Sequence, residues 1–239
     1  MISPTSPKPS ISAFLPCLNE AGNIADTVGR LARVLADIAD HYEIIVVDDG
    51  STDDTDKIVQ QLSSENPNVR LVSHPYNLGY GRAVASGIAT ARYDWVFFSD
   101  GDGQFDFNDL YRFIPYTPDY PLIVGYRRRR QEGFRRTLTS KVYNGVVRLL
   151  FGLRMHDIDC SFKLMRRDMF ERIKVESIQF FVDTEIMTKA HNLGYLMKEL
   201  PVRHLPRRMG KSTIRLRHIL STICEMRRQW REIKSLCRA

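Results

Sequence analysis

Long apolar runs are missing from this 239-residue sequence. A helix needs roughly 20 predominantly apolar residues to span a bilayer, and no stretch of the sequence approaches that length. The start of the chain, residues 1–10, contains several Pro and Ser residues and lacks the apolar centre of a secretory signal. We therefore expect residues 1–10 to be a flexible N-terminus and the chain to stay in the cytoplasm.

Cysteine is scarce, and the four cysteines are far apart. No pair has the CxxC spacing of a zinc or thiol-redox motif, and the six histidines show no HxxxH spacing within a helix. A cytosolic chain of this size needs no disulfide staple. We interpret the cysteines as reduced and expect no metal site built on Cys or His. The cysteines are Cys17, Cys160, Cys224 and Cys237.

The common glycine-rich phosphate loops are also absent. The sequence contains no GxxxxGK[ST] motif, and no GxGxxG motif follows the first predicted strand. ATPases with a P-loop and enzymes with the usual dinucleotide fingerprint depend on these loops to bind phosphate. Both classes are therefore disfavoured, and the first predicted strand is followed instead by Pro16–Glu20.

Charge is present but unevenly distributed. Residues 1–120 carry 8 Lys and Arg against 17 Asp and Glu, whereas residues 121–239 carry 27 against 11, so the two halves have net charges of −9 and +16. An acidic half can hold a cation, and a basic half can attract phosphates, nucleic acid or an anionic membrane. Charge alone leaves these alternatives open, together with a solvated basic face.

Hydrophobic periodicity predicts an α/β fold. Short apolar runs, typical of buried parallel strands, alternate with segments whose apolar residues recur at helical spacing. This alternation favours a mostly parallel sheet with helices on both faces, and ligands then bind beyond the carboxyl ends of the strands. The predicted strands are 11–15, 42–47, 69–73, 95–98 and 122–124, and the predicted helices are 21–39, 53–62, 80–91, 138–151, 182–193 and 214–236.

Two acidic motifs follow predicted strands. Asp48–Ser51 places two carboxylates where they can accept hydrogen bonds from a ribose or a base, although the same residues suit a turn and a helix cap. In Asp100–Gln104, two carboxylates and an amide oxygen can converge on Mg²⁺ or Mn²⁺. A helix-loop-helix calcium loop is disfavoured, because Gln104, Phe105 and Tyr111 occupy the positions that need an acid, Gly and Glu.

Several motifs resemble family 2 glycosyltransferases, particularly the polyprenyl-phosphate (dolichol-phosphate) hexose synthases. They occur in the family's order: Pro16–Glu20, Asp48–Ser51, Asn77–Gly81, Asp100–Gln104, Gly125–Arg127, Asp157–Lys163 and Arg207–Ser212. The resemblance implies a GT-A type catalytic domain over residues 11–213, with a Rossmann-like sheet. It also implies inverting transfer of a hexose from a GDP- or UDP-sugar to dolichyl or undecaprenyl phosphate.

The resemblance assigns roles to individual residues. The sequence departs from the usual pattern at Gly101, Tyr126 and Asp159–Lys163, which leaves the sugar open. The implied donor-binding residues are Pro16, Leu18, Asn19, Glu20, Asp48, Asp49, Asn77, Gly79, Arg82 and Asp100. The implied metal and diphosphate ligands are Asp100, Asp102 and Gln104. The implied acceptor or phosphate ligands are Arg127, Arg136, Ser140, Lys163, Arg207, Lys211 and Ser212. The implied catalytic residues are Asp102, Arg127, Arg136, Asp157, Asp183 and Glu185.

Residues 214–239 predict a basic amphipathic C-terminal helix. Its apolar face includes Leu216, Ile223 and Trp230, and arginines occupy mostly other faces. Such a helix can lie on an anionic membrane or pack on its own domain. The membrane alternative predicts a peripheral protein on the inner face of the membrane, at its cytoplasmic side.

Two other functions compete with transfer to a lipid phosphate. A soluble family 2 enzyme acting on a saccharide or protein hydroxyl would need a general base such as Asp183 or Glu185. These two residues also suit the first turn of a helix for purely local reasons. A nucleic-acid-binding module would explain the basic half, but it leaves the acidic motifs without a role, and we expect no nucleic-acid partner.

Overall fold

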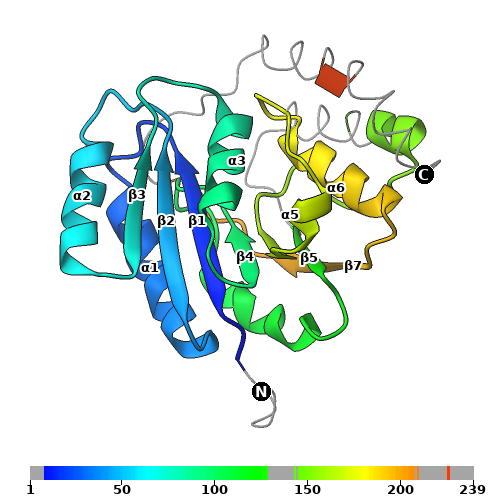
Figure 1. Ribbon diagram of the computed structural model, residues 1–239, viewed down its shortest axis with the longest axis horizontal. Helices are drawn as coiled ribbons and strands as arrows, with labels where there is room; N and C mark the ends of the chain where they lie inside the picture. The colour runs from blue at the N-terminus through cyan, green and yellow to red at the C-terminus, as the bar shows by residue number, and fades with distance from the viewer. Residues whose placement is uncertain (1–7, 129–142, 144, 208, 210–224, 227–239) are drawn as a thin grey trace.

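The computed structural model describes residues 8–128, 143, 145–207, 209, 225 and 226. Strands and helices alternate over the first part of the chain, as the sequence predicts (Figure 1). The strands are β1 (Ile11–Cys17), β2 (Tyr42–Asp48), β3 (Val69–Ser73), β4 (Trp95–Phe98), β5 (Leu122–Arg127), β6 (Lys163–Arg166) and β7 (Met197–Val202). The helices are α1 (Ile24–Ile38), α2 (Thr55–Glu65), α3 (Tyr80–Thr90), η1 (Phe107–Arg112), η2 (Ile114–Tyr116), α5 (Met169–Arg172) and α6 (Val182–Asn192).

The strands form one seven-stranded sheet in the order β3-β2-β1-β4-β6-β5-β7. All neighbouring pairs are parallel except those made by β6, which runs antiparallel to both β4 and β5. The predicted α/β class and mostly parallel sheet are confirmed. The sequence prediction omitted β6 and β7. Neither has an apolar run, because β6 begins and ends with a basic residue and β7 contains Lys, Glu and Pro.

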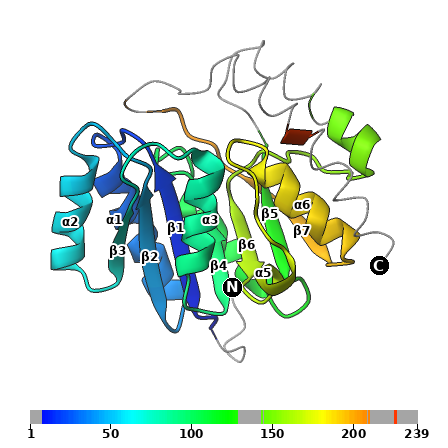
Figure 2. The same cartoon turned by 45° about the horizontal axis from the view of Figure 1, so that its top comes forward.

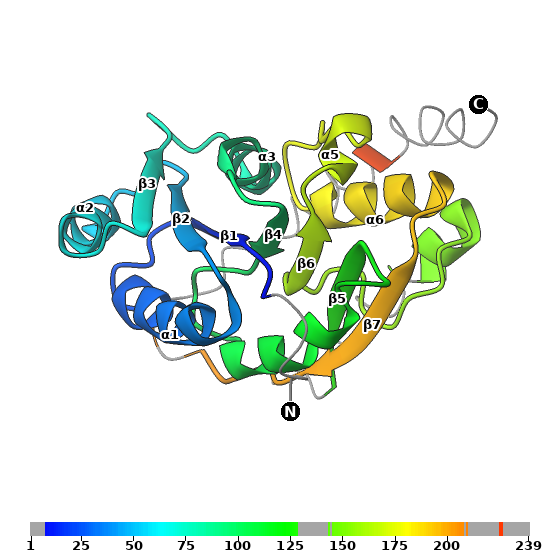
Figure 3. The same ribbon diagram turned by 60° about the horizontal axis from the view of Figure 1, so that its bottom comes forward.

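Helices cover both faces of the sheet. Figure 3 shows α1 on one face and α3 and α6 on the other, and α3 and α6 lie side by side (Figure 2). Strand residues alternate between two cores: Ala13 and Leu15 pack with the α1 side, whereas Phe14 packs with the α3 side. Because both faces are covered, the central strands β1, β2 and β4 are buried over almost their whole length and are mostly apolar.

The α1 helix forms where the helical periodicity predicts it. Its buried face includes Val28, Leu31 and Leu35, and burying each such side chain stabilises the fold by about 1.5–3 kcal/mol. The helix begins at Ile24 rather than at residue 21, because the amides of Asn23 and Ile24 both donate to the Glu20 carbonyl and form a turn there.

The later part of the chain is described incompletely. Residues 145–151 are helical, within the predicted helix 138–151. The predicted C-terminal helix lies outside the described residues except for Glu225 and Met226, which are helical, and most of residues 1–10 also lies outside. None of the described helices combines the length and apolar character needed to cross a bilayer.

A close contact between α3 and β1 makes a testable prediction. A Cβ at Gly87 would lie 2.3 Å from the Phe14 ring, whereas one at Gly29 would have no neighbour within 4 Å. We expect Gly87→Ala to lower the free energy of unfolding by about 1–3 kcal/mol, because a packed core resists extra volume. The matched change Gly29→Ala in α1 should raise it by roughly 0.5–1 kcal/mol. Urea denaturation measures both, and equal effects would contradict the packing.

Candidate active site

Three loops meet at the carboxyl edge of the central strands. The Asp49 amide donates to the Cys17 carbonyl at 3.0 Å, and the Gly101 amide donates to the Pro16 carbonyl at 3.2 Å. A Cβ at Gly101 would lie 3.1 Å from the Cys17 Cβ. The loops after β1, β2 and β4 are therefore tied together, which brings Pro16–Glu20, Asp48–Ser51 and Asp100–Gln104 to one place.

The first acidic motif combines a turn with a buried hub. The Asp48 carboxylate accepts hydrogen bonds from the amide and hydroxyl of Ser51, so the predicted local turn does form. Asp49 accepts from the amides of Leu78 and Gly79, each at 2.9 Å, and contacts His74 Nδ1 at 2.7 Å. Asp49 thereby fixes the Asn77–Gly81 loop beside the site.

The loop after β1 also depends on this motif. Asn19 has a left-handed backbone, with φ of 57°. Its side-chain oxygen accepts from the Thr52 amide at 2.8 Å, and its own amide donates to the Ser51 hydroxyl at 2.8 Å. These bonds hold the Pro16–Glu20 loop against the end of β2. Pro16 is buried and Leu18 is half-buried at the same edge.

Asp100 is held by two hydroxyl groups. Its Oδ1 accepts from the Tyr80 hydroxyl at 2.8 Å, and its Oδ2 accepts from the Ser161 hydroxyl at 2.5 Å. Burial, with the nearby Asp102 charge, raises the pKa of Asp100 to about 6, although both hydroxyls oppose this rise. Two carboxylates so close together favour the binding of a cation beside them.

The donor set fits a cation only if the substrate completes it. Within the described ranges, no cluster of three or more His, Cys, Asp or Glu side chains has the arrangement of a metal site. Asp100 and Asp102 supply two carboxylates, and Mg²⁺ and Mn²⁺ commonly take remaining ligands from substrate phosphates and water. The residues therefore fit a divalent cation that binds together with a diphosphate.

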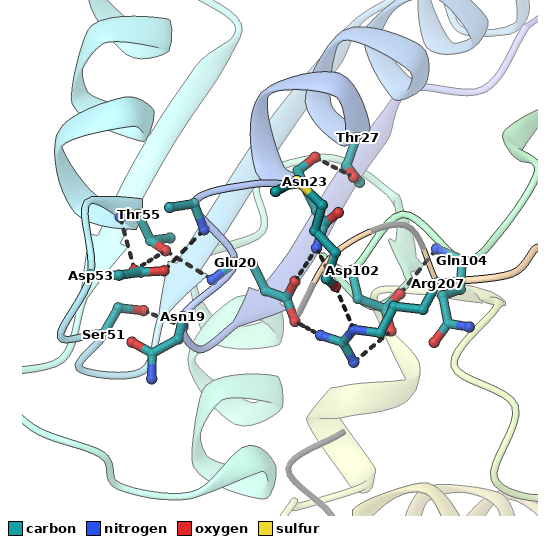
Figure 4. A network of polar contacts seen from close by, with 12 residues as sticks. Asn19, Glu20, Asn23, Thr27, Ser51, Asp53, Thr55, Asp102, Gln104 and Arg207 are labelled. Atoms are coloured by element: carbon teal, nitrogen blue, oxygen red, sulfur yellow. Dashed lines mark hydrogen bonds and ion pairs between the residues drawn. The ribbon is translucent and has the colours of Figure 1, made fainter. Parts of the chain in front are cut away.

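Asp102 belongs to an ion-pair network that spans the chain (Figure 4). Its Oδ1 accepts from the Gln104 amide at 3.0 Å, and its Oδ2 lies 3.6 Å from a guanidinium nitrogen of Arg207. Arg207 also pairs with Glu20, whose other oxygen accepts from Asn23 at 2.7 Å. Burial raises the pKa of Glu20, and Asn23 and Arg207 act against that rise. Arg207 thus places a positive charge between the carboxylates of Glu20 and Asp102.

The segment that carries Arg207 crosses the second acidic motif. The Leu205 amide donates to the Gln104 carbonyl at 2.7 Å, and Gln104 Nε2 donates to the Leu205 carbonyl at 3.1 Å. The Met209 carbonyl accepts from Asn23 at 3.2 Å. Leu205 and Met209 therefore tie this segment to the loop after β4 and to the start of α1.

A second charged cluster lies beyond β5 and β6. Arg127 forms a two-pronged ion pair with Asp157, at 2.7 and 3.0 Å. The Lys163 ammonium is 1% exposed and contacts Asp183 and the Cys160 carbonyl. In the structure this buried ammonium neutralises Asp183, and the predicted phosphate-binding role of Lys163 stays a prediction.

Glu185, a predicted catalytic residue, is also buried among hydrogen-bond donors. Its carboxylate is fully buried and accepts from the amides of Glu176 and Ser177, at distances between 2.9 and 3.2 Å. Lys189 Nζ completes the set at 2.7 Å. Glu185 therefore holds the loop before α6 in place, and its predicted catalytic role stays a prediction.

The remaining predicted residues divide into two groups. Asn77 and Arg82 are exposed near the beginning of α3, beside Gly79, whose φ of 105° requires glycine. Four predicted acceptor residues lie outside the described part of the chain: Arg136, Ser140, Lys211 and Ser212.

Comparison with known proteins identifies the family. The family model described as Glycosyl transferase family 2 matches residues 12–174. The chain belongs to this family. Polyprenyl-phosphate sugar synthases recur among its relatives, as the motif resemblance implies.

Two curated relatives are similar over much of this family 2 chain. Glycosyltransferase AglD of Haloferax volcanii is 31% identical over 230 residues, which cover 92% of this chain and 37% of AglD. Dodecaprenyl-phosphate galacturonate synthase of Rhizobium johnstonii is 31% identical over 169 residues, which cover 69% of this chain and 50% of the synthase. The chain thus spans less than two thirds of either relative.

Among solved structures, glucosyl-3-phosphoglycerate synthase from Mycobacterium tuberculosis, in complex with Mn²⁺ and UDP-glucose, is similar in fold. The TM-score is 0.70 at 21% identity, and the alignment covers 91% of this chain and 78% of that one. The GT-A fold is therefore confirmed.

Two residues of this family 2 site were missing from the sequence prediction. Tyr80 and Ser161 both donate to Asp100, yet neither carries charge. Tyr80 lies inside the Asn77–Gly81 motif and Ser161 inside Asp157–Lys163, so their positions were visible. Their common partner could not be predicted from the sequence, because Ser161 reaches Asp100 through the pairing of β6 with β4, and Tyr80 reaches it from the start of α3.

Asp159, in the second cluster, makes a prediction about pH. Burial, with the charges of Asp183 and Asp157, raises its pKa from 3.8 to about 7. The folded state therefore binds this proton more tightly than the unfolded chain does. As the pH rises through this range, the ionised buried carboxylate lowers the free energy of unfolding by an increasing amount. We expect Asp159→Asn to increase the free energy of unfolding at pH 8 and to have a smaller effect at pH 5.

Urea denaturation at the two pH values measures this difference. The exposed residue Asp119 provides the matched control, because Asp119→Asn should leave stability unchanged at both pH values. A loss of stability on Asp159→Asn at pH 8 would contradict the prediction.

Proposed function

We propose that this protein transfers a hexose, with inversion, from a UDP- or GDP-sugar to a polyprenyl phosphate such as dolichyl or undecaprenyl phosphate. The observation that carries the proposal is the Asp100 and Asp102 pair at the carboxyl edge of β4, tied to the ends of β1 and β2. The polyprenyl-phosphate synthases among the family 2 relatives support the choice of acceptor.

The residues of the acidic half would bind the donor. Asp48, Glu20 and Asn19 lie where parallel strands end, which is the usual position for a nucleoside in open α/β sheets. Asp102, with Asp100 and Gln104, would hold Mg²⁺ or Mn²⁺ against the diphosphate. Such a cation stabilises the negative charge that develops on the departing nucleoside diphosphate. The Arg207 guanidinium would then bind a phosphate oxygen of the donor in place of the Asp102 carboxylate.

The acceptor phosphate would act as the nucleophile. A phosphate monoester has a second pKa near about 6 and is largely dianionic at neutral pH, so it needs positioning more than a base. Arg127 lies at the end of β5 with its guanidinium oriented by Asp157. A planar guanidinium that is already fixed in position suits bidentate binding of phosphate. Arg136, Ser140, Lys211 and Ser212 would add to this site.

A hydroxyl acceptor is the second candidate. The predicted bases do not favour it, because Asp183 is paired with buried Lys163 and Glu185 is fully buried. One observation does: the pKa of Asp159 is raised by burial to about 7, a value suited to a general base. Under this alternative, Asp159→Asn abolishes transfer to a hydroxyl, whereas transfer to a phosphate survives the change.

A panel of nucleotide-sugars tests the proposal. Release of UDP or GDP would be measured with and without Mg²⁺ or Mn²⁺, and with and without a polyprenyl phosphate. We expect one donor to react fastest with both metal and lipid phosphate present. Asp102→Asn should reduce that rate by at least about 100-fold, because it removes charge that acts on the leaving group. Release that is insensitive to both metal and lipid would refute the proposal.

Peripheral attachment to the cytoplasmic face of a membrane is part of the proposal. It rests on the sequence of residues 214–239 and on the basic second half of the chain. We expect the protein to sediment with vesicles that contain anionic lipid and to be released by salt, because screening weakens attraction to a charged surface. Neutral vesicles are the control. Equal recovery in the supernatant with both vesicle types would exclude the attachment.

A further inference from the structure

We infer that Tyr80 and Ser161 are positioning residues that fix the Asp100 carboxylate, so that Asp100 and Asp102 can take one divalent cation with the donor diphosphate. The inference rests on the proposed function and adds to it. It assigns a role to two uncharged hydroxyl groups that come from opposite halves of the sequence.

The first step is that each Asp100 oxygen has its own donor. Tyr80 bonds Oδ1 at 2.8 Å and Ser161 bonds Oδ2 at 2.5 Å. A carboxylate that accepts one hydrogen bond at each oxygen cannot rotate without losing both. Its remaining lone pairs therefore face a fixed direction, which a metal site requires.

The second step is that the Tyr80 ring is itself fixed. It stacks on Phe180 with ring centroids 5.2 Å apart and lies 6.3 Å from Phe98. The backbone of Gly81 donates to the Ile178 carbonyl at 2.8 Å, which anchors the start of α3. The hydroxyl of Tyr80 therefore reaches Asp100 from a rigid support.

The third step is that sheet register places Ser161. Phe98 pairs with Lys163 and Phe97 with Leu164 in the antiparallel ladder of β4 and β6. Continuing that register by two residues puts Ser161 opposite Asp100, and Ser161 is 3% exposed. The antiparallel direction of β6 is what brings a hydroxyl to this carboxylate.

The fourth step is that Asp102 has a different kind of partner. Its Oδ2 faces the Arg207 guanidinium at 3.6 Å, a longer contact than either bond to Asp100. Asp100 is thus the fixed member of the pair, and Asp102 is the member that exchanges a partner when a cation arrives. Loosening Asp100 would lower metal affinity even though neither hydroxyl touches the metal.

Calorimetric titration of UDP and of GDP, with and without Mn²⁺, tests the inference. Tyr80→Phe keeps the ring packing and removes one hydroxyl, and Ser161→Ala removes the other. We expect each change to weaken Mn²⁺-dependent binding by about tenfold or more, the usual effect of a hydrogen bond to a charged group. Binding of the nucleotide without Mn²⁺ should stay within about twofold of the unaltered protein, the usual limit of independence.

Matched controls come from the same chain. The Tyr111 hydroxyl donates to the Asp37 carboxylate at a distance of 2.5 Å, and this pair lies away from the site. The Ser63 hydroxyl donates to the Val59 carbonyl within α2. Tyr111→Phe and Ser63→Ala should leave Mn²⁺-dependent binding unchanged. Thermal unfolding verifies that every variant is folded. If Ser161→Ala does not fold, the binding measurements on Tyr80→Phe still test the inference.

Combination with Asp100→Asn separates positioning from general support. If the hydroxyls act through Asp100, adding Tyr80→Phe or Ser161→Ala to Asp100→Asn changes Mn²⁺-dependent affinity by less than about twofold. Full additivity, or wild-type affinity in both single variants, overturns the inference while leaving the proposed function intact. Failure of the unaltered protein to bind either nucleotide with Mn²⁺ overturns both.

Discussion

Negative charge crowded at one edge of the sheet is the constraint on which the rest of the site depends. Asp48 ends β2, Asp49 follows it, and Asp100 and Asp102 follow β4, so the four carboxylates lie at the ends of the two parallel strands that flank β1. Each obtains a different compensation. Asp48 accepts from the amide and hydroxyl of Ser51, Asp49 contacts two amides and the His74 ring, Asp100 accepts from two hydroxyls, and Asp102 contacts a backbone amide and a guanidinium. The hydrogen bonds to Asp48, Asp49 and Asp100 fix the shape of the site, whereas the guanidinium of Arg207 lies at a longer distance, 3.6 Å, from Asp102.

Support for this edge extends deep into the second half of the chain. Buried Glu185 holds the amides of Glu176 and Ser177, and the next residue, Ile178, accepts from Gly81 at the start of α3. A Cβ at Gly81 would lie 2.2 Å from the Ser177 carbonyl oxygen, so the two backbones touch directly. A carboxylate that looks catalytic by its position thus acts by stabilising a loop.

Hydrophobic pattern predicted the first four strands, the three helices between them and the mostly parallel sheet, because apolar runs and helical spacing alternate clearly there, whereas the short helices η1 and η2 were not predicted. The acidic motifs were equally visible in the sequence, because each follows a predicted strand, although Asp48–Ser51 also suits a turn and a helix cap. Burial was not visible: Lys163 and Glu185 resemble surface charges until the tertiary structure encloses them. Nor was β6 visible, because basic residues begin and end its short run, unlike the wholly apolar β4. Without β6 the bond from Ser161 to Asp100 could not be predicted.

The place of β6 also has a consequence for the order of assembly during synthesis. β4 is the fourth strand to leave the ribosome, but the strand that pairs with its outer edge ends only at Arg166. Until then β4 is an open edge, and such edges invite pairing with other chains. The sheet around the acidic half therefore stays incomplete, and Asp100 lacks its bond from Ser161, until β6 in the basic half has been translated.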